Sequence, residues 1–204
     1  MASRPNAHRP GPGRPSSGAR RRILDGALGV LKRDGYAGLT MAKVAAASGQ
    51  NKALIGYHFG SKQGLVAAVA RQVADEITRE VLDGLGEPHD ARKLVEGTLA
   101  GIWSVMDRDE GIARVYFDLA GQSATEPEAR AIIAEMKAGF RSVLADLLAG
   151  LHDGPPRAQR DAVAVFLVAG IEGLALERLD RGETPELRRA RAMWARAAAG
   201  AITG

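Results

Sequence analysis

The first periodic run of apolar residues in the chain predicts a helix from about Gly18 to Gly35. Apolar side chains recur at the spacing of one helix face, at Ile23, Leu24, Ala27, Val30 and Leu31. Three polar residues and then Gly35 follow, which is a common way for a helix to end. The segment before it, residues 1–17, has three arginines, four prolines and almost no apolar side chains, so we expect a flexible basic arm.

Two short helices joined by a glycine turn follow this first helix. Thr40 is a good N-cap for a helix over 41–48, and Gly49 ends that helix because glycine adopts the left-handed conformation cheaply. Asn51 can cap a second helix over 52–59. A stabilising helix followed by such a pair is a helix-turn-helix, whose second helix enters the DNA major groove. The same spacing also occurs in ordinary helical bundles.

The rest of the pattern is helical and predicts an all-α fold. Ser61 can cap a long helix to about Leu85. Turn-forming residues then separate further helices, and no segment shows strand alternation. The expected spans are 90–107, 110–120, 126–151, 157–180 and 185–202. We therefore expect a three-helix helix-turn-helix domain at 18–62 and a larger, all-helical domain at 63–204.

Charge is divided unevenly between these parts. Residues 1–62 hold eleven Lys or Arg and two Asp, a net charge of +9, whereas the remainder carries −5, which together give the chain's +4. A basic N-terminal third on a mildly acidic body indicates a polyanionic partner, and the alternative is a solvated basic tail. The chain has no cysteine, which excludes disulfides and thiol catalysis and fits a reducing cytoplasm. Its longest apolar stretch, 162–171, is too short to span a membrane as a helix.

The helix-turn-helix segment closely resembles the DNA-binding domain of the TetR family of bacterial regulators. The resemblance rests on Gly35-Tyr-Ala-Gly-Leu-Thr-Met-Ala-Lys-Val-Ala-Ala-Ala-Ser-Gly, and on Asn51-Lys-Ala-Leu-Ile-Gly-Tyr-His-Phe-Gly-Ser-Lys62 followed by Leu65. It covers about residues 20–66. It implies a homodimer that binds a palindromic DNA operator and usually releases it when a small molecule enters the body. Gly56, Lys43 and Gln50 depart from the family pattern, which leaves the operator sequence open.

The expected DNA contacts fall into two groups. Base readers at the start of the recognition helix are Gln50, Asn51, Lys52 and Ala53, since amide, ammonium and methyl groups suit base edges. Thr40 and Lys62, at helix starts, suit phosphate oxygens. The resemblance places Tyr57 and His58 against the phosphate backbone, and Gly56 stands where the family often has an aromatic contact. The alternatives are simple capping by Thr40 and Asn51, a solvated Lys62 and partial burial of the two rings. Leu54, Ile55 and Phe59 are expected in the core, and DNA contact by Arg4, Arg9, Arg14 and Arg20 to Arg22 stays open.

The last two helices are the expected dimer interface. The helix from Arg157 is apolar on nearly every side over 162–176 and must be covered on most faces. The final helix begins with Thr184 as cap and Pro185 at its first position. Two such helices per chain can form a four-helix interface, and the alternative is an intrachain core. The predicted interface residues are Phe166, Gly170, Gly173, Leu174, Leu187, Ala190 and Trp194.

Large side chains in the middle helices are candidates for an apolar cavity that binds an unidentified effector. They are Trp103, Met106, Tyr116, Phe117, Met136, Phe140 and Phe166. Plain core packing is the alternative for each. The four histidines are far apart and show no metal-ligand spacing, and no catalytic motif or cofactor fingerprint is present. The sequence therefore favours a ligand-responsive repressor without a cofactor; an activator, a ligand-independent DNA-binding factor and a helical enzyme or carrier are the alternatives.

Overall fold

The computed structural model describes residues 17–86 and 90–204, and within these ranges it contains helices and no strand. The predicted arm and its Arg4, Arg9 and Arg14 lie outside the described residues, except that Ser17 already belongs to the first helix. The predicted helices are confirmed to within a few residues at their ends. Their bounds are α1 (Ser17–Gly38), α2 (Met41–Ser48), α3 (Lys52–Phe59), α4 (Lys62–Leu85), α5 (Ala91–Arg108), α6 (Glu110–Gln122), α7 (Pro127–Gly150), α8 (Arg157–Arg181) and α9 (Pro185–Thr203).

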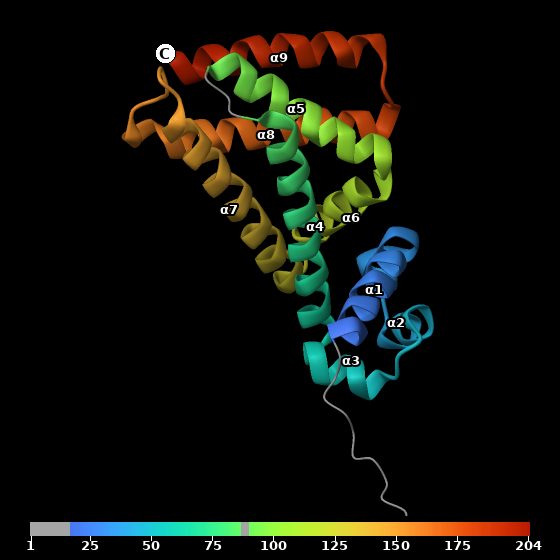
Figure 1. Cartoon of the computed structure of the whole chain (residues 1–204). Helices are drawn as coiled ribbons and strands as arrows, with labels where there is room; N and C mark the ends of the chain where they lie inside the picture. The colour runs from blue at the N-terminus through green and yellow to red at the C-terminus, as the bar shows by residue number, and fades with distance from the viewer. Residues whose placement is uncertain (1–16, 87–89) are drawn as a thin grey trace, which may run out of the picture.

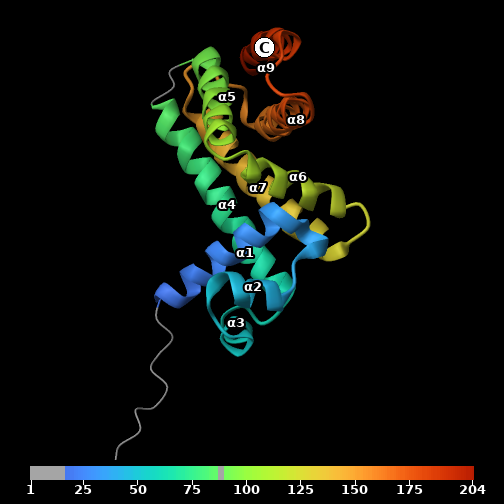
Figure 2. The same cartoon turned by 90° about the vertical axis from the view of Figure 1, so that its right-hand side faces the viewer.

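The helices form a small head and a larger body joined by α4. Helices α1, α2 and α3 lie together at one end, with α3 at the outer tip (Figures 1 and 2). Helix α4 runs from α3 to the opposite end, where α8 and α9 lie across the molecule (Figure 1). The recognition helix and the last two helices are therefore at opposite ends of the chain's fold.

Side-chain caps set the boundaries of the head helices as the sequence predicts. The hydroxyl of Thr40 accepts the N–H of Lys43 at 3.2 Å, and the side chain of Asn51 accepts the N–H of Leu54 at 2.8 Å. Ser61 caps α4 in the same way through the N–H of Gly64 at 3.0 Å. These local bonds fix where α3 begins and how it turns into α4.

Helix α1 is broken at Gly35 and continues for one turn beyond it. Gly35 has φ 69° and ψ 179°, a conformation that glycine adopts far more readily than other residues. The expected stop is therefore a kink, and the expected turn after Gly35 is partly helical. The break turns the backbone of Tyr36 towards α6, where its N–H donates to the Asp118 carboxylate at 2.5 Å.

One apolar core runs from the head into the body. It joins residues of α1 to α4 with others from the end of α5, α6 and the start of α7, among them Ile23, Val44, Ile55, Leu65, Val105, Val115, Leu119 and Ile132. A second core unites α5, the second half of α7, α8 and α9. Because packing continues across position 62, the division into domains at 62/63 stays a prediction. No helix among the described residues has the length and apolarity needed to cross a membrane.

Candidate DNA interface and effector cavity

Helix α3 presents a polar outer face and buries the opposite one. Ile55 is fully buried, and Leu54 and Phe59 pack against the same core, as predicted. Lys52 and Ala53 are exposed, and Tyr57 exposes 74% of its surface, which is unusual for an aromatic side chain. A large exposed ring on a short, rigidly held helix is suited to contact with another molecule.

Gln50 and Asn51 are engaged by the protein's own backbone. The amide of Gln50 donates to the carbonyl of Gly49 at 3.1 Å, and the oxygen of Asn51 is occupied by its cap bond. In the protein without DNA, Asn51 therefore acts as the N-cap of α3, which was the alternative to base reading. Base reading by either residue stays a prediction, whereas Lys52 and Ala53 can meet base edges without giving up such a bond.

The predicted phosphate contacts have different surroundings. Thr40 is exposed at the start of α2. The ammonium of Lys62 lies 4.7 Å from the centre of the Tyr36 ring, so it is held by a cation–π contact rather than fully solvated. The ring of His58 is half-buried, and its Nε2 is enclosed without a hydrogen-bond partner among the described residues. Phosphate contact by Thr40, Tyr57, His58 and Lys62 stays a prediction.

The structure shows the surroundings of Lys43 and Gly56, two residues that depart from the family pattern. Lys43 cannot close the capping box of α2, and its ammonium instead bonds Asp34 at 2.9 Å and the carbonyl of Gly38 at 3.0 Å. Hydrogen bonds from Arg33 and then Lys43 lower the pKa of the Asp34 carboxyl below its ordinary value. At Gly56, an added Cβ would meet nothing within 4 Å, so this glycine leaves open space on α3.

Arginines of α1 extend the basic surface of the head. Arg20 lies with its guanidinium 5.4 Å from the centre of the Phe59 ring at the end of α3, and Arg21 and Arg22 are exposed. The position of Arg20 beside the recognition helix makes contact with a phosphate backbone geometrically accessible. DNA contact by these three arginines stays a prediction.

Replacing two lysines of the head should separate base reading from phosphate binding. We expect Lys52→Ala to cost about 1–3 kcal/mol at one base position and to relax sequence preference there. Lys62→Ala should weaken all DNA sequences alike and lower the salt slope by roughly one. Fluorescence anisotropy on operator variants at several salt concentrations measures both effects. Lys93→Ala, an exposed lysine of α5, is the control, and identical behaviour of the two head variants would contradict the assignment.

Helix α6 ties the head to the body. Besides the bond from Tyr36 to Asp118, the ammonium of Lys32 on α1 pairs with Asp109 at the start of α6. Val115 and Leu119 of α6 belong to the core that contains the head. The neighbouring residues Ile112, Ala113, Tyr116 and Phe117 line a cavity in the body. Helix α6 therefore contacts both the cavity and α1.

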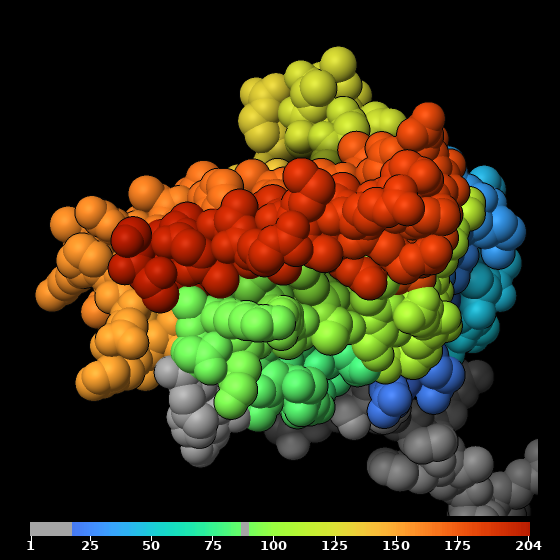
Figure 3. All heavy atoms as spheres, turned by 90° about the horizontal axis from the view of Figure 1, so that it is seen from above, coloured from blue at the N-terminus to red at the C-terminus, as the bar shows by residue number. Residues whose placement is uncertain are grey.

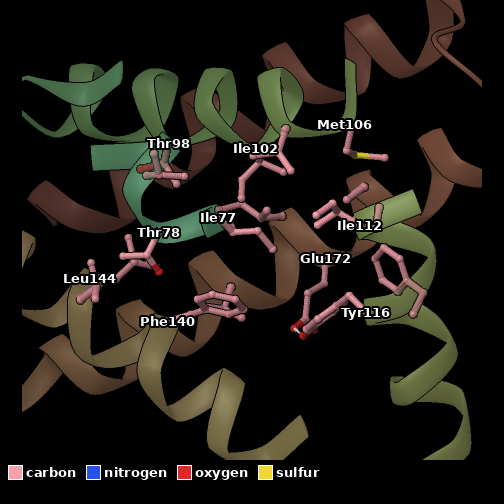
Figure 4. A pocket seen from close by; sticks show the side chains of 18 of the residues that line it. Ile77, Thr78, Thr98, Ile102, Met106, Ile112, Tyr116, Phe140, Leu144 and Glu172 are labelled. Atoms are coloured by element: carbon pink, nitrogen blue, oxygen red, sulfur yellow. Dashed lines mark hydrogen bonds between the residues drawn. The ribbon is translucent and has the colours of Figure 1, made fainter. Parts of the chain in front are cut away.

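The cavity has a volume of about 120 Å³ and is lined by residues of five helices, α4 to α8. Its wall is almost entirely aliphatic and aromatic, as Figure 4 shows. Of the predicted ligand-binding residues, the structure brings Met106, Tyr116, Phe117 and Phe140 together there. Sequence reasoning missed the aliphatic part of the wall and Glu172. The signal for Glu172 was available, since it is a carboxylate inside an otherwise apolar helical stretch.

Glu172 is held in a bonded cluster at the α6–α8 side of the cavity (Figure 4). It accepts a hydrogen bond from the hydroxyl of Tyr116, and its second oxygen accepts one from the ammonium of Lys137 on α7 at 2.7 Å. Burial, and then the bond to Glu172, raise the pKa of the Tyr116 phenol far above its ordinary value. Tyr116 is therefore neutral, and it acts as the donor to the carboxylate.

Three other predicted cavity residues lie elsewhere. Trp103 is on the face of α5 that meets α9, where its indole N–H donates to Glu183 at 2.8 Å and Arg178 and Arg191 lie over its ring. Met136 is buried in the core shared with the head. Phe166 stacks on Trp194 at the outer side of α8. These three residues do not line this cavity, because large size and helical position do not reveal which neighbour covers a side chain. Trp103 instead lines a second pocket, between α5 and α9.

The predicted dimer residues divide into exposed and intrachain groups. Phe166, Gly173 and Ala190 are exposed. By contrast, Leu187 is 3% exposed inside the second core, and Leu174 and Trp194 pack against that core. A Cβ at Gly170 would overlap the indole of Trp194 in the same chain. Leu187 therefore serves packing within one chain, which corrects its assignment to the interface. Gly170 also packs against its own chain but is not fully buried, and its interface role stays a prediction.

The outward surface of α8 and α9 nevertheless carries large apolar side chains. Seen from the far end, α9 lies uncovered along its length (Figure 3). The exposed apolar residues of these two helices are Val165, Phe166, Leu176 and Met193. A group of this kind on a described surface is typical of a contact with another protein chain.

Comparison with known proteins shows the class of this chain. The model of the TetR family of bacterial regulatory proteins matches residues 23–69, and that of the C-terminal part of BetI-type transcriptional repressors matches residues 91–203, more than half of the chain. The chain belongs to the TetR family and is a DNA-binding transcriptional regulator. Its body is of the BetI type. The predicted family, all-α fold and regulatory class are thus confirmed.

Individual relatives are distant but span most of the chain. The transcriptional regulator BetI of Escherichia coli is 23% identical over 77% of this chain and 80% of its own length. A TetR-family regulator from Rhodococcus superposes with a TM-score of 0.78 at 24% identity, over 92% of this chain and all of its own. A regulator from Saccharomonospora viridis, in complex with choline, gives 0.68 at 22% identity, over 87% of this chain and 94% of its own.

Proposed function

We propose that the protein is a homodimeric repressor that binds a palindromic operator and releases it when a small molecule fills the α4–α8 cavity. The observation that carries this proposal is the double role of α6, which forms part of the cavity wall and also holds α1 of the head. The comparison agrees with repression, since the family model that matches the body describes the C-terminal part of BetI-type transcriptional repressors. We further propose that it acts in the cytoplasm and has no catalytic activity.

The proposed dimer pairs the outward faces of α8 and α9 from two copies. Val165, Phe166 and Leu176 on α8 and Met193 on α9 are exposed apolar side chains, and in the proposed dimer they meet those of the second copy across a two-fold axis. Two α3 helices in one dimer then read two half-sites about 34–36 Å apart on one face of the duplex. The palindrome of the operator follows from this symmetry.

The proposed switch acts through α6 and α4. A ligand that fits the cavity better when α6 is displaced stabilises a head position in which the two α3 helices no longer match the half-site spacing. A coupling of about 1–3 kcal/mol changes occupancy of the operator several-fold or more. The cavity wall of α4, including Ile77, Thr78 and Val81, lies on the same helix that leads into α3.

Reporter transcription from the protein's own operator tests the proposal. We expect higher transcription when the gene is deleted, lower transcription when it is restored, and relief when the effector is added. Higher transcription on restoring the gene would identify an activator, and an unchanged response to every compound that binds the cavity would identify a ligand-independent factor.

A further inference from the structure

The polar side chains of the cavity wall are already bonded within the protein. The hydroxyl of Thr98 donates to the carbonyl of Leu94 at 2.7 Å. Tyr116 and Lys137 occupy the two oxygens of Glu172. The hydroxyl hydrogens of Thr98 and Tyr116 are thus used within the protein, so a ligand that needs either donor must break an internal bond. Glu172 keeps acceptor sites, but each of its oxygens already faces one donor of the protein. Thr78, a half-buried hydroxyl on α4, is the other polar side chain of the wall.

The charges around the cavity also disfavour a cationic ligand. The carboxylate of Glu172 is neutralised by Lys137, whose side chain is 31% exposed while that of Glu172 is 23% exposed. Arg141 adds a second positive charge close enough to act on Tyr116. A cation that enters the cavity must lose its hydration, and the one carboxylate of the wall is already paired.

The size and lining of the cavity favour a small apolar molecule. A dry protein cavity of about 150 Å³ lined by aliphatic and aromatic side chains accommodates benzene. The volume here is about 120 Å³, and its wall offers side chains such as Ile77, Ile102, Phe117 and Phe140. Burial of apolar ligand surface in such a wall is favourable without any ionic contact.

We infer that the effector is an uncharged, predominantly apolar molecule close to benzene in size, with at most one hydrogen-bonding group, which Thr78 serves. The inference rests on the proposed function in that it takes this cavity as the effector site. An effector of this class distinguishes the chain from a regulator whose effector is an organic cation. The pairing of Glu172 with Lys137 is the feature that excludes the cation.

A pair of isosteric probes tests the charge requirement. Neohexanol is the uncharged alcohol in which a quaternary carbon replaces the nitrogen of choline, so the two probes share their shape. In isothermal titration calorimetry of the full chain, we expect neohexanol to bind at least roughly tenfold more tightly than choline, a difference of about 1.4 kcal/mol. Choline binding as tightly as neohexanol, or neither probe binding, would overturn the inference.

Removing the partner of Glu172 should reverse the selectivity. In Lys137→Met, the carboxylate at the wall is no longer neutralised, and we expect choline affinity to rise at least roughly tenfold while neohexanol affinity stays unchanged. The double variant Lys137→Met/Glu172→Gln removes both charges and should lose the gain for choline. Lys93→Met, at an exposed position near the start of α5, is the matched control. No gain for choline in folded Lys137→Met would contradict the role given to the pair.

Filling the cavity shows whether the probes bind there. Ala175 lines the cavity and is 6% exposed, so Ala175→Phe should abolish neohexanol binding. Ala113→Leu, a smaller change at the wall, serves if the first variant does not fold, as judged from its thermal melt. Unreduced binding in the folded variant would overturn the inference. Operator binding without ligand is measured separately. If the inferred effector class is wrong, the probes do not bind as expected although the operator is bound; if the proposed function is wrong, the operator itself is not bound.

Discussion

Gly173→Arg is expected to convert the dimer into a monomer and to lower operator affinity by roughly 10²–10⁴-fold. Gly173 lies on the exposed apolar face of α8, and an added Cβ meets nothing within 4 Å, so the chain itself accommodates the change. In the proposed dimer, the arginine brings an unpaired charge into an apolar contact. Loss of the second recognition helix removes the gain from simultaneous binding to two half-sites.

Sedimentation equilibrium and gel-shift titration measure these two effects. Gly139→Arg on α7 is the matched control, because this glycine is also exposed and helical and its Cβ position is also free of neighbours within 4 Å. The control should remain dimeric and bind the operator normally. A dimeric Gly173→Arg protein with normal affinity would place the interface elsewhere than on α8 and α9.

Gly64→Ala is expected to destabilise the head by about 1–3 kcal/mol and to abolish specific DNA binding. A Cβ at this position would overlap the carbonyl oxygen of Phe59, so α3 must shift relative to α4. The overlap involves backbone at the corner between the two helices and no flexible side-chain end can relieve it. Because α3 carries Lys52 and Tyr57, a shift of its end moves the base-reading face.

Gly84→Ala separates this contact from the effect of helix propensity. Gly84 lies near the other end of α4, exposed and with no atom within 4 Å of an added Cβ. Alanine there should stabilise the protein by up to about 1 kcal/mol, since glycine is a poor helix former. Urea unfolding of both variants gives the comparison. Equal stabilisation by the two substitutions would show that the α3–α4 corner tolerates a side chain.

The head was predictable from sequence because its determinants are local. Thr40, Asn51 and Ser61 each bond a backbone N–H three residues ahead, and such bonds depend on residue type and spacing alone. Gly49 ends α2 with φ 65°, as its position indicated. The same rules placed the ends of the body helices, where Pro185 follows the capping Thr184.

The cavity was only partly predictable, because periodicity identifies an apolar face and not its neighbour. Met106 and Trp103 lie on one helix, yet the first meets the cavity and the second meets α9. Because they are three residues apart, both lie on broadly the same apolar side of α5. Only the three-dimensional arrangement of α6, α8 and α9 determines which part of that side faces the cavity and which part faces α9. Gly170 shows the same limit, since the backbone approach it permits is to Trp194 of its own chain.

The Lys137–Glu172 pair lay beyond sequence reasoning for a related reason. The two residues are 35 positions apart on α7 and α8, and Lys137 alone has the pattern of an ordinary helical charge. Their contact depends on how these two helices pack. The unusual feature that the sequence did contain, a carboxylate within the apolar stretch of α8, indicated a partner without identifying it.

Selection of binding sites from fragmented genomic DNA by the purified full chain tests the central claim most directly. A TetR-family dimer that reads DNA with α3 should enrich a palindromic sequence whose half-sites lie about 34–36 Å apart, or a multiple of that distance. Lys52→Ala should enrich the same palindrome with relaxed preference at one position of each half-site. Enrichment of no sequence, at salt concentrations that suppress non-specific binding, would contradict the account.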